Sequence, residues 1–385
     1  MFKKKCAVAA LCLCLAFCLS GCAVLGEVAE SLLPSAAPTS LPVVNHDEES
    51  PIYLAYTRLS ENEQSIYRQL CEHIEAQKTD VTIENADENM VMHAFYAVFA
   101  DHPEYFWLSG GYSYSAYTFF GKDKVEFQMS TRSVYTDLTG EAQALRAAVD
   151  RIAAEAVLCE GDYQKALFVH DAIIKECTYD NQAADVLKEK NGDSNLRAAS
   201  AHGCLVDHRA VCSGYAAAFQ LVMQKLGIVC GRISGCGEDG LGHEWNYIRL
   251  GDTYAYVDVT WDDPHEEEEL QAPGHEFFCV SEEELLKSHT IDPEEWRPPV
   301  TTDQYEYYRV HGWYFDTYEA SSVRQSLREQ ADAGFMTVKF GSLAEAKRAK
   351  EDLIDAERIF WIVPWQSLGY TAGASELILT VWKQE

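Results

Sequence analysis

Basic residues are scarce in this chain. Its 385 residues include 31 lysines and arginines against 61 aspartates and glutamates. Proteins that bind nucleic acid neutralise phosphates with clustered basic side chains, so this balance excludes a nucleic-acid partner. An anionic lipid surface would repel such a protein for the same reason.

Spacings typical of a metal or cofactor site are also missing. The sequence has no Cys-x-x-Cys pair, and none of its cysteines and histidines has the spacing of a zinc site. It shows no internal repeat, which excludes a solenoid. We therefore expect no metal ligands and no cofactor.

The N-terminus carries an apolar run behind basic residues. Lys3, Lys4 and Lys5 precede segment 7–19, which has the length of a signal-peptide core and is short for a membrane span. The segment ends in Leu-Ser-Gly-Cys at 19–22, which resembles the lipobox of bacterial lipoproteins. We expect residues 1–21 to be a signal peptide and Cys22 to carry lipid. The protein would then sit on the extracellular or periplasmic face of the cell membrane, held by a flexible, proline-containing tether at 22–50.

The rest of the chain predicts α+β units with a substantial core, since 47% of all residues are hydrophobic. Ser60 and Glu63 form a capping box ahead of a helix, and alternation around 121–123 predicts a hairpin. Beyond Pro299 the pattern restarts, with strands at 335–340, 360–363 and 377–382 and a helix at 343–353. We expect an N-terminal unit at 51–135, a central unit at 136–298 and a C-terminal unit at 299–385.

A cysteine opens the helical stretch "CSGYAAAFQLVMQK", which begins at Cys212. The positive end of a helix favours a thiolate, so this residue is a candidate nucleophile. The alternative is a cysteine that only fills the core, and we assign that structural role to Cys204, Cys230 and Cys236.

Segments 243–250 and 253–259 predict a hairpin about Gly251 and Asp252. Pairing Leu250 with Thr253 places His243 and Asp258 on one face as diagonal neighbours, within reach of a hydrogen bond. A carboxylate that orients an imidazole, and an imidazole that takes a thiol proton, are what a nucleophilic cysteine needs. Glu244 points to the other face by the same parity.

The segments "AVCSGYAAAFQLVMQKLGI", "GHEWNYIRLGDTYAYVDVTWDDP", "YDNQ" and "SAHGCLVDH" together resemble the transglutaminase-like superfamily, over roughly residues 160–290. The resemblance implies a papain-related α+β core, in which a cysteine-bearing helix packs on an antiparallel sheet that carries His and Asp. It implies that Cys212 is the nucleophile, His243 the base and Asp258 the residue that orients the base. The expected activity is an acyltransferase or hydrolase acting on carboxamide or peptide bonds, with a protein or peptide substrate, cell-wall peptide among the candidates.

Other interpretations stay open. The triad alone does not separate cross-linking from deamidation or proteolysis, and the chain could instead be a cell-envelope binding module that keeps this fold without catalysis. A zinc site at Cys212, His243 and Asp258 is a third alternative. The backbone N–H of Cys212 is the first expected oxyanion donor, and His202 is a candidate for the second. His170 and Asp171 are adjacent on a predicted helix, where neighbours do not face each other, so we interpret them as scaffold.

Overall fold

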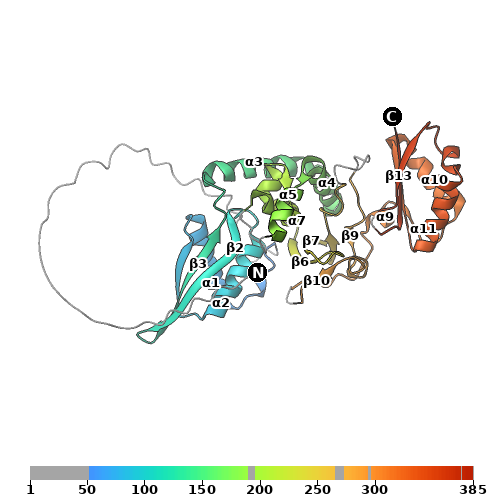
Figure 1. The fold of residues 1–385 in the computed structure, drawn as a ribbon. Coiled ribbons are helices and arrows are strands. Elements are labelled where there is room, and N and C mark those ends of the chain that lie inside the picture. The colour runs from blue at the N-terminus through green and yellow to red at the C-terminus, as the bar shows by residue number, and fades with distance from the viewer. Residues whose placement is uncertain (1–51, 190–195, 265–272, 294–295, 374, 385) are drawn as a thin grey trace, which may run out of the picture.

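The computed structural model describes residues 52–189, 196–264, 273–293, 296–373 and 375–384 (Figure 1). The expected signal segment, Cys22 and the tether lie outside these residues. Helices and strands occur in mixed order along the chain, so the predicted α+β class is confirmed. Among the described helices, none combines the length and apolar character that crossing a bilayer requires.

The elements follow the chain in one series. The helices are α1 Glu61–Glu75, α2 Glu88–Asp101, α3 Leu138–Ala156, α4 Gly161–Glu176, α5 Asn181–Glu189, α6 Ala201–Leu205, α7 Cys212–Lys225, α8 Glu282–Leu285, α9 Tyr307–Val310, α10 Ala320–Gln330 and α11 Leu343–Lys350. The strands are β1 Asp80–Glu84, β2 Leu108–Phe119, β3 Lys122–Thr131, β4 Thr178–Tyr179, β5 Arg209–Ala210, β6 Cys230–Cys236, β7 Gly242–Leu250, β8 Thr253–Val257, β9 Phe278–Val280, β10 Thr290–Ile291, β11 Tyr314–Phe315, β12 Phe335–Phe340, β13 Leu368–Thr371 and β14 Ile378–Lys383.

The first sheet has the strand order β1-β3-β2 and packs with α1 and α2. The predicted capping box is confirmed at the start of α1, where Ser60 N donates to Glu63 Oε2 at 2.9 Å. The predicted hairpin is confirmed as well, with Phe119 paired to Lys122 across Phe120 and Gly121. Both turn residues have positive φ, at +49° and +78°, as a tight hairpin turn with right-handed strand twist requires.

The central sheet has the order β10-β6-β7-β8-β9, all antiparallel, and α7 packs on β6 and β7 (Figure 1). The predicted register is confirmed, since Leu250 pairs with Thr253 and Asn246 with Val257. A helix that opens with Cys212 therefore packs on an antiparallel sheet that carries His243 in β7, with Asp258 directly after β8.

The C-terminal sheet has the order β11-β12-β14-β13. The strand expected at 335–340 is confirmed as β12, and the one expected at 377–382 as β14. The strand expected at 360–363 is wrong, because Arg358–Trp361 form a 3-10 turn. Ile359, Ile362 and Val363 are buried at helical spacing, while the side chains between them are exposed, so the run of apolar residues does not alternate as a strand would.

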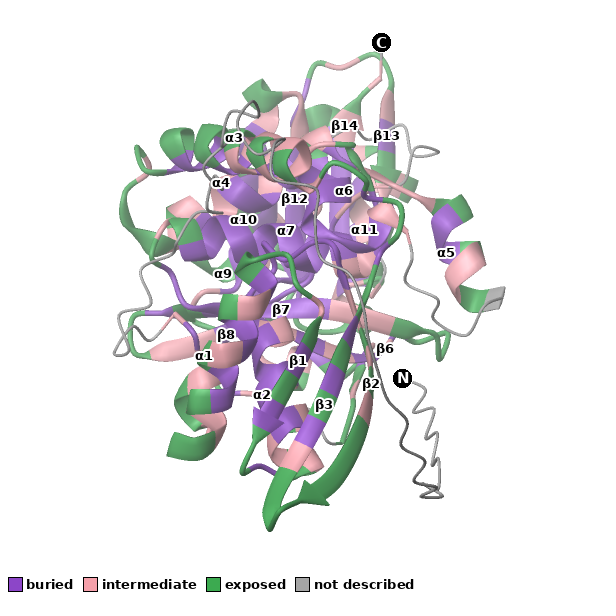
Figure 2. Ribbon diagram, turned by 90° about the vertical axis from the view of Figure 1, so that its left-hand side faces the viewer, coloured by how far each residue is buried: buried purple, intermediate pink, exposed green. Residues whose placement is uncertain are grey.

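One hydrophobic core extends from the first sheet into the central unit. Its buried members run from α1 and β3 through α3 and α4 to α7 and β8, and α7 is buried along most of its length, in contrast to the exposed far end of the β2–β3 hairpin (Figure 2). Polar contacts reinforce this core, since Gln220 Nε2 donates to Ala100 O at 2.8 Å and Gln224 Nε2 to Asp101 O at 2.9 Å. The boundaries between the three expected units stay predictions.

Candidate active site

Cys212 is the first residue of α7, with a half-buried thiol. Its N-cap residue, Val211, offers no side-chain oxygen to the first turn, so the amides there stay available to a negative group. The helix start is pressed against the 3-10 turn Arg197–Ala199, because a Cβ on Gly214 would lie 2.4 Å from Ala198 O. This close packing needs glycine and fixes the place of the thiol.

His243 and Asp258 meet as the register predicts. His243 Nε2 donates to Asp258 Oδ2 at 2.6 Å, the imidazole is 8% exposed and the carboxylate is fully buried. Glu244 lies on the opposite face, where Arg232 Nη1 donates to its Oε1 at 2.9 Å. The rings of Trp245 and Trp261 lie 5.8 and 5.4 Å from the His243 ring, so two tryptophans flank the imidazole.

Asp258 is held by hydrogen bonds to both of its oxygens. Oδ1 accepts from Thr260 N at 3.0 Å and Trp261 N at 3.2 Å, and Oδ2 accepts from His243 and from His289 Nε2, the latter at 3.1 Å. Burial alone would raise the pKa of this carboxyl, but the two imidazoles outweigh burial and hold the pKa well below its usual range. Asp258 is therefore a fixed negative charge at neutral pH.

The charge of Asp258 sets the state of His243. Burial opposes protonation of the imidazole, yet the carboxylate and the neighbouring Cys212 thiol outweigh it and raise the pKa of His243 to about 10. Since Nε2 is engaged by Asp258, Nδ1 is the ring nitrogen left to exchange a proton with Cys212. The arrangement can hold an imidazolium beside the Cys212 thiol at neutral pH, and a neighbouring cation is what favours the thiolate of a nucleophilic cysteine.

His289 is a site residue that the sequence analysis missed. It lies on the segment before β10, is fully buried, and its ring centre is 4.2 Å from that of Trp261. Ser288 Oγ lies 2.9 Å from its Nδ1, which leaves Nε2 to donate to Asp258. No local motif marks this histidine, because its partner is 31 residues away.

Replacing His289 with alanine is expected to lower the free energy of unfolding by about 2 kcal/mol, because a buried carboxylate loses one of its donors. His289→Gln keeps an N–H donor and is expected to recover a large part of this loss. Chemical denaturation of both variants measures the difference. His93→Ala, at a 63% exposed histidine that pairs with Glu63, is the control and should change stability by less than about 1 kcal/mol. Equal losses in the alanine and glutamine variants would show that ring packing on Trp261, and not the bond to Asp258, is what His289 supplies.

The prediction of His202 as an oxyanion donor is wrong. The ring is buried, its Nε2 lies 2.7 Å from Glu141 Oε2, and its Nδ1 lies 3.2 Å from Arg197 Nη2 and 3.5 Å from Asp207 Oδ2, so both ring nitrogens are engaged by charged side chains. Tyr179 in β4 is a hydroxyl residue near enough to Cys212 and Asp258 for both to act on it electrostatically. Burial, followed by the nearby Cys212 and Asp258, raises the pKa of its phenol, so the O–H stays protonated and can donate.

The reasoning about His170 and Asp171 is also wrong in one respect. The two side chains do meet, with His170 Nδ1 2.9 Å from Asp171 Oδ1, and a third residue, His275, joins them. The other cysteines behave as expected: Cys204 and Cys230 are buried, Cys236 is half-buried, and all the described cysteines are free thiols.

Comparisons with known proteins add modest likenesses. Neither a family model nor a curated protein matches the chain. A crystal structure described as a TGase is 13% identical over 55% of this chain and 61% of that chain, at a TM-score of 0.30. A "putative cysteine protease" from Cytophaga hutchinsonii is 13% identical over 47% of this chain and 64% of that chain, at a TM-score of 0.24. A "putative protease" from Parabacteroides distasonis is 9% identical over 39% of this chain and 36% of that chain, at a TM-score of 0.21. The chain spans less than two thirds of the length of each of these structures.

Proposed function

We propose that this protein is a thiol enzyme of the transglutaminase-like kind, which acts on carboxamide or peptide bonds through Cys212, His243 and Asp258. The observation that carries the proposal is the fully buried Asp258 bonded to His243 at 2.6 Å, beside a thiol on the first residue of a helix. A binding module has no need to bury a charged carboxylate behind an imidazole and a thiol.

In the proposed reaction the Cys212 thiolate attacks the substrate carbonyl carbon, and a C–S bond forms. The oxyanion accepts from the Cys212 N–H, with the Tyr179 hydroxyl as the second donor. The C–N bond then breaks, the leaving ammonia or amine takes a proton from His243 Nδ1, and a thioester remains. Water or a primary amine attacks the thioester, gives its proton to His243 and releases the thiolate.

The test offers the purified protein a glutamine-containing peptide together with a small primary amine, and follows products by mass spectrometry. Replacement of ammonia by the amine identifies a transglutaminase, replacement by water a deamidase, and a cut backbone a protease. The proposal expects one of these products and a trapped thioester on the peptide that contains Cys212. If a panel of such peptides yields neither product nor thioester, the binding-module interpretation becomes the better one.

We further propose that lipid on Cys22 holds the enzyme at the outer face of the cell membrane. Cys22→Ala is expected to move the protein from the membrane fraction to the soluble fraction, because 28 basic and 61 acidic residues after the signal give no electrostatic attraction to anionic lipid. Fractionation and mass analysis of the mature N-terminus measure this. Cys18→Ala, within the apolar signal run, is the matched control and should leave anchoring unchanged; a Cys22→Ala protein that stays in the membrane fraction would contradict the proposal.

A further inference from the structure

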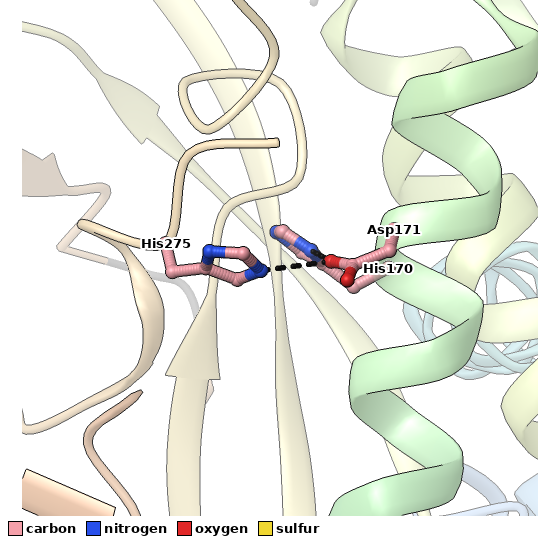
Figure 3. A group of neighbouring side chains, drawn as sticks. All are labelled: His170, Asp171 and His275. Atoms are coloured by element: carbon pink, nitrogen blue, oxygen red, sulfur yellow. Dashed lines mark hydrogen bonds and ion pairs between the residues drawn. The ribbon is translucent and has the colours of Figure 1, made fainter. Parts of the chain in front are cut away.

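A second group of histidine and aspartate side chains lies apart from the triad (Figure 3). His170 and Asp171 belong to α4, and His275 belongs to the segment that leads into β9. The three side chains come from opposite sides and converge, as the close-up shows. Neither the proposed reaction nor the core needs two imidazoles to meet a carboxylate at this place.

The three polar atoms lie close together, with both imidazoles at hydrogen-bond distance from one carboxylate oxygen. Asp171 Oδ1 lies 2.9 Å from His170 Nδ1 and 2.9 Å from His275 Nε2. All three ligand atoms lie within 4.8 Å of one another, each from a different residue. Two imidazole nitrogens and one carboxylate oxygen are a common three-residue set for zinc, which binds such donors at about 2.0 to 2.2 Å in tetrahedral geometry.

The surroundings of His170 match those of a metal-bound imidazole. Its other nitrogen, Nε2, lies 3.1 Å from Asp262 Oδ2, and both side chains are fully buried. Asp262 is itself fixed, because its Oδ1 accepts from Phe277 N at 2.9 Å. A carboxylate that accepts the remaining N–H of a ligating histidine fixes its orientation in zinc sites.

The third ligand and the opening to solvent are also in place. The ring of His275 stacks on Tyr307 with centroids 3.9 Å apart and planes 6° apart, which holds the direction of its Nε2. Asp171 is 39% exposed, whereas His170 and His275 are 0% and 9% exposed. An ion can therefore reach the group from the Asp171 side, where a water can complete the tetrahedron.

The balance of charge favours a divalent cation. Asp171 and Asp262 bring two carboxylates to a largely buried group, and the histidines are neutral when they bind a metal. A doubly charged ion offsets both carboxylates. Calcium and magnesium prefer oxygen ligands throughout, so the two imidazoles favour zinc.

The geometry points to a zinc site formed by His170 Nδ1, Asp171 Oδ1 and His275 Nε2, with Asp262 supporting His170. The site is separate from the thiol chemistry. It ties α4 to the segment before β9 through His275 and to the turn after β8 through Asp262, whose backbone N donates to Asp258 O at 3.2 Å. Zinc at this place would thus brace the turn that carries the carboxylate of the triad.

Zinc titration of the chelator-treated protein by calorimetry, with the zinc content after dialysis measured by mass spectrometry, tests the proposal. We expect one zinc ion per chain. His275→Ala and Asp171→Asn are each expected to remove binding, and Asp262→Asn to weaken it by about 10-fold to 100-fold, as loss of a supporting carboxylate does. Asp171→Asn, on the solvent side, keeps a hydrogen-bond acceptor for the histidines and covers the case in which His275→Ala fails to fold.

Two controls separate this site from other zinc ligands of the chain. His311→Ala removes a histidine whose ring also contacts Tyr307, at 4.2 Å between centroids, but which lies outside the group, and this variant should bind zinc like the wild type. The other group of possible ligands among the described residues is His243, Asp258 and His289. His243→Ala removes a member of that group and should still bind zinc like the wild type. The cobalt-substituted protein should show visible d–d bands without a thiolate charge-transfer band, since cysteine is not a ligand.

The proposal is overturned if the wild type retains no more zinc than His275→Ala and Asp171→Asn, or if His243→Ala is the variant that loses the ion. The first result would leave His170 as a protonated imidazole bridging two carboxylates. The second would move the zinc to the triad.

Discussion

Replacing Cys212 with alanine is expected to lower turnover by at least about 10⁴-fold, because the residue that forms the covalent bond is gone. His243→Ala is expected to cost nearly as much, since the thiol loses the group that takes its proton. Asp258→Asn should leave a measurable residual rate, because the nucleophile and base remain and only their orientation and charge support are impaired. The peptide and amine assay, read by mass spectrometry, gives the three rates.

Cys236→Ala is the matched control for the loss of a thiol, because Cys236 is a half-buried cysteine of β6 that has no part in the triad. Its turnover should equal that of the wild type. Thermal unfolding of each variant shows whether the fold is kept. Product formation by Cys212→Ala at the wild-type rate would refute a thiol mechanism.

Alkylation of Cys212 by iodoacetamide should be nearly constant from pH 6 to pH 9 in the wild type. Asp258 and the thiol, against the effect of burial, raise the pKa of His243 to about 10, so its imidazolium stays charged over most of this range. A cation beside a cysteine favours the thiolate, which is the species that iodoacetamide alkylates. In His243→Ala the cation is lost. An ordinary thiol has a pKa of about 8.5, so only about 0.3% of it is thiolate at pH 6. Alkylation of Cys212 in this variant should therefore be about 300-fold slower than in the wild type at pH 6, but less than about two-fold slower at pH 9.

Mass spectrometry of the peptide that contains Cys212 measures these rates without knowledge of the substrate. Cys159, another half-buried cysteine, serves as an internal reference in the same digest and should respond to pH alike in both proteins. A ratio of wild-type to His243→Ala rates that does not change with pH would mean that no ion pair forms. The interpretation as a binding module would then be better supported than the interpretation as a thiol enzyme.

The part of the site that one hairpin controls was predictable. A two-residue turn fixes the register, and the register fixes which side chains share a face, so His243 and Asp258 follow from counting along the sequence. The start of α7 was equally accessible, because Cys212 directly precedes the small and apolar residues of the helix.

Residues brought in by long-range pairing were not predictable. His289 reaches Asp258 because β10 pairs with β6. The two strands approach so closely that a Cβ on Gly235 would lie 1.9 Å from Thr290 O. No spacing along the chain encodes that approach. His275 reaches Asp171 over 104 residues in the same way. The expected strand at 360–363 failed for a local reason, since apolar character alone does not distinguish a strand from a short helical turn.

The two glutamines of α7 couple the cysteine helix to α2 of the N-terminal part of the chain. Gln220 and Gln224 are 1% and 5% exposed, and their amides donate to carbonyls at the end of α2. A fragment lacking residues 52–135 would leave these two buried amides without their acceptors. We therefore expect the fragment that carries the nucleophile to be less stable than the whole chain. Amide hydrogens of α2 and α7 should exchange with deuterium through a single cooperative opening, because the two helices share one hydrophobic core and are joined by both glutamine amides.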